Sequence, residues 1–118
     1  MNKVIYQVNH SKSGNMHFEL DSPKKSVRFA CDWPYDLATN EWMSPTMEFA
    51  LRDFINQIKR LSRRKRVIVP GTHGGSITLT RLNSTAIEVR LVGENTSSRE
   101  EWHFCIPARP HDLLPHRD

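Results

Sequence analysis

The sequence predicts an α+β fold in which one amphipathic helix packs on one face of an antiparallel sheet of about six or seven strands. Three observations lead to this prediction. Apolar and polar residues alternate in several short segments, which is the pattern of strands with one buried face. Turn-forming residues separate these segments, as between antiparallel neighbours. One longer segment has apolar residues at steps of three and four, which is typical of an amphipathic helix.

Three strands are expected before the helix. Residues 4–8 are a short apolar segment, and two further segments alternate strictly. The inward positions of these two strands are Met16, Phe18, Leu20, Val27, Phe29 and Cys31. The segments between them, 9–15 and 22–25, are polar or contain Pro23. Hairpin connections are therefore the simplest topology.

The helix is expected to begin at Ser44. A serine hydroxyl can accept a hydrogen bond from the first turn, and Pro45 would occupy the first helical position, where its missing N–H is tolerated. Glu48 would lie near the positive end of the helix dipole. The apolar stripe of this helix, about 18 residues long, comprises Met47, Ala50, Leu51, Phe54, Ile55, Ile58 and Leu61.

Four strands are expected after the helix, with Gly- and Asn-containing turns between them. They cover residues 67–69, 76–81, 87–92 and 102–106. The order is therefore three strands, one helix and four strands. Residues 1–107 are expected to form a single α+β domain, and residues 108–118, which contain Pro110 and Pro115, a flexible surface tail.

The length and composition indicate the number of domains and the cellular compartment to expect. The chain has 118 residues, enough for one self-sufficient core. No apolar segment approaches the ~20 residues that span a bilayer, and the N-terminus lacks the pattern of a secretory signal. We therefore expect a soluble cytoplasmic protein. In that compartment Cys31 and Cys105 would be reduced thiols. If the chain is exported by another route, a disulfide between them is the alternative.

The positive charge is concentrated in one place. The net charge is +4, but residues 1–58 and residues 67–118 each carry one more acidic than basic residue. The excess comes from six cations without an intervening acid: Lys59, Arg60, Arg63, Arg64, Lys65 and Arg66. This run could bind phosphate groups, which makes a nucleic-acid-binding accessory protein one alternative. No aromatic residue is interleaved for base stacking, so a solvated helix end is the other interpretation.

A second candidate surface is acidic and aromatic. Trp and Tyr supply much of the energy of protein interfaces, and neighbouring carboxylates could meet a basic partner. The segment contains Asp32, Trp33, Tyr35, Asp36, Glu41 and Trp42. On the polar face of the sheet, Glu19, Glu88 and His103 could extend this partner-binding surface. The alternative is that Trp33 and Trp42 pack beneath the start of the helix.

Catalysis and metal binding have weaker support in the sequence. His17 and His103 would share the polar sheet face, so a small hydrolase using both as acid and base is a further alternative. No Cys-x-x-Cys or His-x-x-x-His motif occurs, so no metal site is expected. The loop 72–75 has neither a nucleophile elbow nor a phosphate-binding motif. We therefore expect a protein that is not an enzyme and needs no cofactor.

The order of features resembles bacterial immunity proteins of polymorphic toxins, including those of contact-dependent growth inhibition. The similarity covers about residues 40–107 and rests on the segment 44–54, Gly74-Gly75, the strand 77–80, Val92-Gly93 and the segment 101–104. It implies a stoichiometric inhibitor that binds one toxin domain, often a nuclease, and blocks its active site without catalytic residues of its own. Inhibitors of basic nucleases are often acidic, whereas this chain is basic overall. The acidic segment 32–41 could face the toxin while the basic run faces away.

Overall fold

The structure is a computed structural model that describes residues 3–10, 14–32, 46–94 and 99–115. Eight strands, one α-helix and one 3-10 helix follow each other along this part of the chain. Their bounds are β1 Lys3–His10, β2 Gly14–Asp21, β3 Ser26–Asp32, β4 Thr46–Ala50, α1 Leu51–Leu61, β5 Arg66–Pro70, β6 Ser76–Asn83, β7 Ala86–Glu94, β8 Arg99–Ile106 and η1 Pro110–Leu113.

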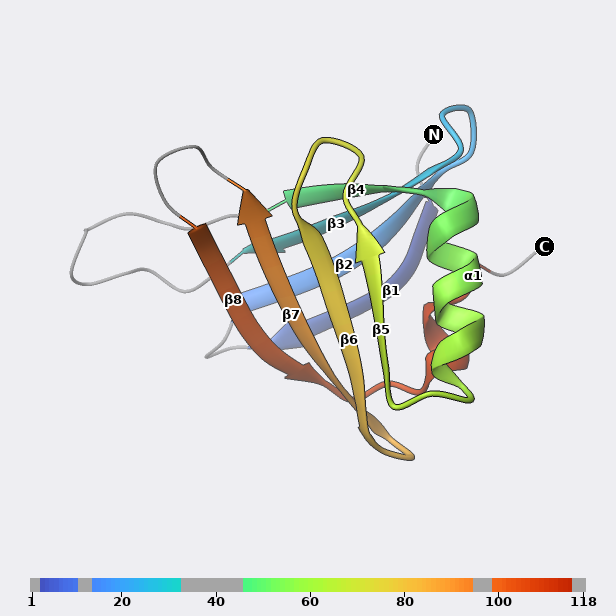
Figure 1. Ribbon diagram of the computed structural model, residues 1–118, viewed down its shortest axis with the longest axis vertical. Coiled ribbons are helices and arrows are strands. Elements are labelled where there is room, and N and C mark those ends of the chain that lie inside the picture. Colours follow the sequence, from blue (N-terminus) through green and yellow to red (C-terminus); the bar gives the residue numbers. More distant parts are fainter. Residues whose placement is uncertain (1–2, 11–13, 33–45, 95–98, 116–118) are drawn as a thin grey trace.

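The strands form two four-stranded antiparallel sheets. The first has the order β1-β2-β3-β4 and the second β5-β6-β7-β8, so every strand pairs with its neighbour in sequence. In Figure 1 the second sheet lies across the first, and α1 stands at one side of both. The α+β class and the antiparallel pairing are confirmed. The expectation of one sheet with six or seven strands is wrong.

The length of the helix explains why two sheets form. With 11 residues, α1 is about 16 Å long at 1.5 Å per residue. Seven strands spaced ~4.8 Å apart would form a sheet roughly twice as wide. One such helix cannot cover that sheet, so the two apolar sheet faces cover each other. Period-two alternation reveals that one face is buried but not what buries it.

A single hydrophobic core connects the two sheets and α1. Phe18 and Phe29 from the first sheet, Leu79 and Val89 from the second, and Phe54 from α1 are fully buried in one cluster. The Phe18 ring lies 5.2 Å from that of Phe29 and 5.4 Å from that of Phe54, measured between centroids. Tilted aromatic contacts of this kind add to the burial energy, so Phe54 fixes the helix against the first sheet.

The helix begins later than the sequence predicts. Thr46–Ala50 is not helical: it forms β4, which pairs with β3 from Ser26↔Ala50 to Ala30↔Thr46. The same segment also alternates, because Phe49 is buried and Met47 packs against the core, while Thr46 is exposed. Pairing with β3 satisfies the backbone groups of these residues. Ser44 and Pro45, the expected cap, lie outside the described residues.

The backbone of a turn replaces the expected serine cap. Ala50 precedes α1 and makes no side-chain cap, but the N–H of Leu51 donates to the carbonyl of Lys25 at 2.9 Å. Lys25 adopts a positive φ of 51° in the turn between β2 and β3. The β2–β3 hairpin therefore provides an acceptor for one N–H group of the first helical turn.

The C-terminal segment also differs from expectation. We expect a flexible surface tail from residue 108, but Ala108 and Leu113 are buried in the core and Pro110–Leu113 forms η1. The Tyr6 hydroxyl donates to the carbonyl of Pro107 at 3.1 Å. This contact joins β1 to the start of the segment, so residues 108–115 complete one side of the fold.

The loop between β5 and β6 is the glycine turn that the sequence predicts. Gly74 and Gly75 have φ values of 100° and 72°, a region that favours glycine. The N–H of Gly71 donates to the carbonyl of Gly75, and the N–H of Thr72 donates to the carbonyl of Glu48. The turn thereby joins the second sheet to β4. None of the helices in the described part of the chain is long and apolar enough to cross a membrane.

Candidate functional site

The six cations of the basic run gather where α1 ends and β5 begins. We call this set the basic corner: Lys59, Arg60, Arg63, Arg64, Lys65 and Arg66. All six residues are exposed. Lys59 and Arg60 belong to the last turn of α1, Arg66 is the first residue of β5, and the other three lie in the short connection between them.

Backbone bonds give this connection a defined shape. The N–H groups of Arg63 and Arg64 both donate to the carbonyl of Arg60, at 2.9 and 2.8 Å. The Ser62 hydroxyl donates to the carbonyl of Lys59 at 2.7 Å. The carbonyls at a helix end otherwise lack partners. Here local donors occupy two of them, so the neighbouring cationic side chains are not needed for that purpose.

Arg81 of β6 anchors the connection from the other side. Its Nη1 donates to the carbonyl of Ser62 at 3.0 Å, and its N–H donates to the carbonyl of Lys65 at 2.7 Å. Arg66 donates from Nε to the Thr80 hydroxyl at 3.3 Å. These hydrogen bonds hold the basic corner against β6 of the second sheet.

No carboxylate neutralises the basic corner within the part of the chain that the structure describes. Close contacts between acidic and basic side chains there include His17 with Glu19, at 2.8 Å, and Arg109 with Asp112, at 3.6 Å, and neither contact involves the corner. Like charges placed together without counter-charges create a positive potential that attracts anions. The corner is thus a preformed electrostatic site.

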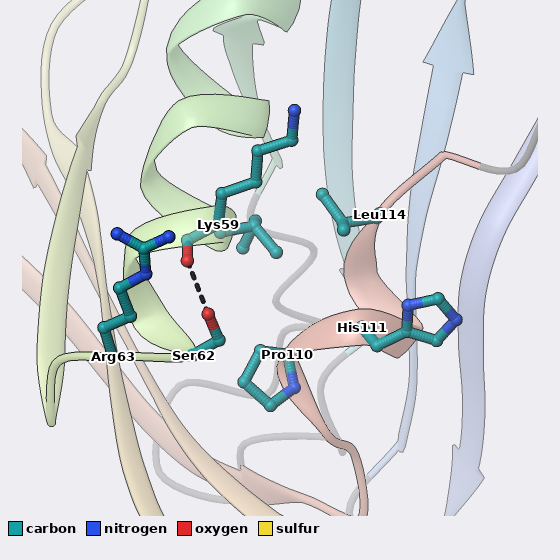
Figure 2. A pocket seen from close by; sticks show the side chains of 7 residues that line it. Lys59, Ser62, Arg63, Pro110, His111 and Leu114 are labelled. Atoms are coloured by element: carbon teal, nitrogen blue, oxygen red, sulfur yellow. Dashed lines mark hydrogen bonds between the residues drawn. The ribbon is translucent and has the colours of Figure 1, made fainter.

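A groove with a volume of about 330 Å³ adjoins the corner. Its walls come from the last turn of α1 with the two residues after it, and from η1 with the residue after it, as Figure 2 shows. In that view the Ser62 hydroxyl points to the Lys59 carbonyl, to which it donates. The lining residues are Ile58, Lys59, Ser62, Arg63, Pro110, His111 and Leu114.

The carboxylate of Asp112 in η1 contacts Arg109, the residue that precedes this helix. Asp112 accepts from the backbone N–H of Arg109 at 2.9 Å through Oδ2, and Oδ1 lies 3.6 Å from the Arg109 guanidinium. The backbone bond from Arg109 is the main cause that lowers the pKa of Asp112; burial opposes it, and the Arg109 charge adds to the lowering. Asp112 does not line the groove, which contains two cations and no acid.

The acidic, aromatic surface lies mostly outside the described residues. This holds for Trp33, Tyr35, Asp36, Glu41 and Trp42. Asp32 is the last residue of β3, where its backbone pairs with Asn15. The structure therefore gives the point from which this segment leaves the first sheet, but not the arrangement of its side chains.

The residues expected on one polar sheet face belong to two different sheets. Glu19 lies in β2, paired with Arg28 of β3, whereas Glu88 lies in β7 at the position opposite Cys105 of β8. His103 pairs with Arg90 in the second sheet. The prediction of a shared face is wrong, because it assumed a single sheet. Glu19 therefore does not share a sheet face with Glu88 and His103.

The same separation removes the support for a histidine pair. His17 belongs to β2 of the first sheet and contacts Glu19 through Nε2, at 2.8 Å. His103 belongs to β8 of the second sheet, so the two histidines do not share a sheet. Acid and base must both reach one substrate, and the single sheet face expected to present them together is not formed.

Metal ligands and thiols do not converge in the described part of the chain. No group of three His, Cys, Asp or Glu residues is placed there to hold a metal ion. Cys105 is an exposed, free thiol on the second sheet.

Sequence reasoning found the cations but missed the opposite wall of the groove. Its signal was present: Asp112 follows Arg109 by three residues, the spacing of a reciprocal cap, and the apolar Leu113 and Leu114 come next. Two prolines near these residues suggested a tail instead. Comparison with protein-family models, curated proteins and solved structures gave no match to this chain.

Proposed function

We propose that this protein binds nucleic acid through the phosphate backbone, using the basic corner. The observation that supports this proposal is the set of six exposed cations, mounted on a fixed turn and without a carboxylate partner among the described residues. Lys and Arg that replace the counterions of a phosphate chain give binding that is strong at low salt and independent of sequence.

The rigidity of the turn favours recognition over a merely soluble surface. Long cationic side chains lose rotamer freedom on binding, but here the backbone that carries them is already ordered by Arg81 and by the bonds to Arg60. Arginines outnumber lysines in the corner by four to two. Arginine is the residue that pairs with phosphate through two parallel hydrogen bonds.

The experiment compares two variants with the same loss of charge. R64Q/K65Q removes two cations of the corner, and K24Q/R52Q removes two exposed cations elsewhere. Binding of a fluorescent single-stranded RNA and of a DNA duplex is followed by anisotropy. We expect R64Q/K65Q to weaken binding by about tenfold at low salt and K24Q/R52Q to change it much less. Equal losses would mean that only net charge matters.

A second candidate is the toxin-neutralising function that the family resemblance implies. One observation favours it. The segment 33–45 joins Asp32 to Thr46, at the end of β3 and β4 remote from α1, because Ala50 at the other end of β4 leads into the helix. The acidic segment therefore starts far from the basic corner (Figure 1), and the two surfaces could serve separate partners.

This candidate has its own test. The tagged protein is captured from its native cell extract after nuclease treatment and washed at high salt. A toxin domain that is retained by the wild-type chain and lost from the variant D32N/D36N/E41Q would support neutralisation through the acidic segment. Retention by both would exclude that segment as the contact surface.

A further inference from the structure

The groove beside the basic corner combines two kinds of wall. Lys59, in the last turn of α1, and Arg63, two residues after the end of this helix, both line the opening. Pro110 and Leu114, which are both partly buried, contribute apolar surface to the same opening. A site that needed only to attract a phosphate chain would not require an apolar wall. The combination fits a ligand with an anionic group attached to a flat, less polar body.

The end of a helix is normally a poor place for an anion, because the last carbonyls carry partial negative charge. In this structure three of these carbonyls already accept hydrogen bonds. Lys59 O accepts from Ser62 Oγ, Arg60 O from the next turn, and Ser62 O from Arg81. Their charge is partly compensated, and the ammonium and guanidinium groups remain directed to the surface.

The size of the groove limits what can enter. A volume of about 330 Å³ is near the lower end of the ~300–1,000 Å³ typical of small-molecule sites. This suits one nucleotide rather than a helix or a folded domain. The absence of an acid from the lining removes the repulsion that a phosphate would otherwise meet.

We propose that this groove is a binding site for one nucleotide, with its phosphate at Lys59 and Arg63 and its base against Pro110 and Leu114. The occupant is either a free mononucleotide or the phosphorylated end of a strand. This inference rests on the proposed function and deepens it, because it distinguishes a shaped subsite from the rest of the basic corner.

The first test uses AMP as the probe, with adenosine and inorganic phosphate as partial ligands. Titration is followed by calorimetry and by the NMR signals of the Ile58 and Leu114 methyl groups in the wild-type protein. We expect AMP to bind at least about tenfold more tightly than either partial ligand, since both halves of the site contribute, and to shift both methyl signals. Equal binding of AMP and phosphate, or unmoved methyl signals, would overturn the inference.

Matched variants then separate the groove from general electrostatics. K59Q/R63Q removes the two lining cations, and K24Q/R52Q removes two exposed cations outside both the groove and the basic corner. We expect the first variant to weaken AMP binding about tenfold, as for lost charge-assisted contacts, and the second to leave it nearly unchanged. Equal weakening by both would reduce the site to a general charge effect and contradict the proposal.

Oligonucleotides distinguish the source of the nucleotide and the level of any failure. Tighter binding of a 5′-phosphorylated strand than of its 5′-hydroxyl form, with competition by AMP, would identify a strand end. AMP binding without this difference would identify a free mononucleotide. If oligonucleotides bind and AMP does not, the groove proposal fails while the proposed function stands. If neither binds, both fail.

Discussion

Asp112 holds η1 together through contacts with a single residue. Its carboxylate accepts from the Arg109 backbone and lies near the Arg109 guanidinium. The same carboxylate affects Tyr6. Burial is the main cause that raises the pKa of the Tyr6 phenol, and the negative charge of Asp112 raises it further. The Tyr6 hydroxyl therefore stays protonated at neutral pH and keeps donating to Pro107. These two residues connect the C-terminal segment to β1.

The variant D112N should lower the free energy of unfolding by about 0.5 kcal/mol. This is the low end for a hydrogen bond, because solvent screens the site. The folded-state pKa of Asp112 is lowered, so its stabilisation is present above the unfolded-state pKa and is lost as pH falls through the folded-state pKa. Urea unfolding between pH 7 and pH 2 measures this. The gap between wild type and D112N should close at the acidic end; a gap independent of pH would contradict the assignment.

At the scale of elements, the strand segments could be predicted because alternation is a direct consequence of a half-buried strand. The start of α1 could not. Met47, Ala50 and Leu51 satisfy a helical stripe, while Phe49 and Met47 equally satisfy alternation. The choice between helix and strand is decided by the edge of β3 that would otherwise be unpaired, a tertiary feature that no local pattern contains. The positions of η1 and of the groove depend in the same way on contacts between distant segments.

Leu113 provides a test of the C-terminal segment. It is fully buried, whereas Leu82 is 47% exposed. The variant L113A should lower the free energy of unfolding by about 2–4 kcal/mol, and the control L82A should change it by less than about 0.5 kcal/mol. Chemical denaturation monitored by circular dichroism gives both values. Equal, small effects would show that residues 108–115 behave as the tail that the sequence suggests.

At the scale of the whole molecule, two features of the charge distribution come together. The sequence shows that the positive charge is local, and the fold places it on a rigid turn beside a groove. The residues of the polar strand positions could be predicted, but not their division between two sheets, because period-two alternation does not tell how many sheets share the core. The pattern therefore predicts one surface for Glu19, Glu88 and His103, whereas the fold divides them between two sheets.

The salt dependence of RNA binding tests the central claim most directly. For the wild-type protein, log K should fall linearly with log salt concentration, with a slope of about −3 to −4 if five or so cations of the corner contact phosphates of a single strand. In R64Q/K65Q the slope should become shallower by about 1.4, since each lost contact removes about 0.7, while K24Q/R52Q should keep the wild-type slope. An unchanged slope in R64Q/K65Q, or the same change in both variants, would contradict the assignment of binding to the basic corner.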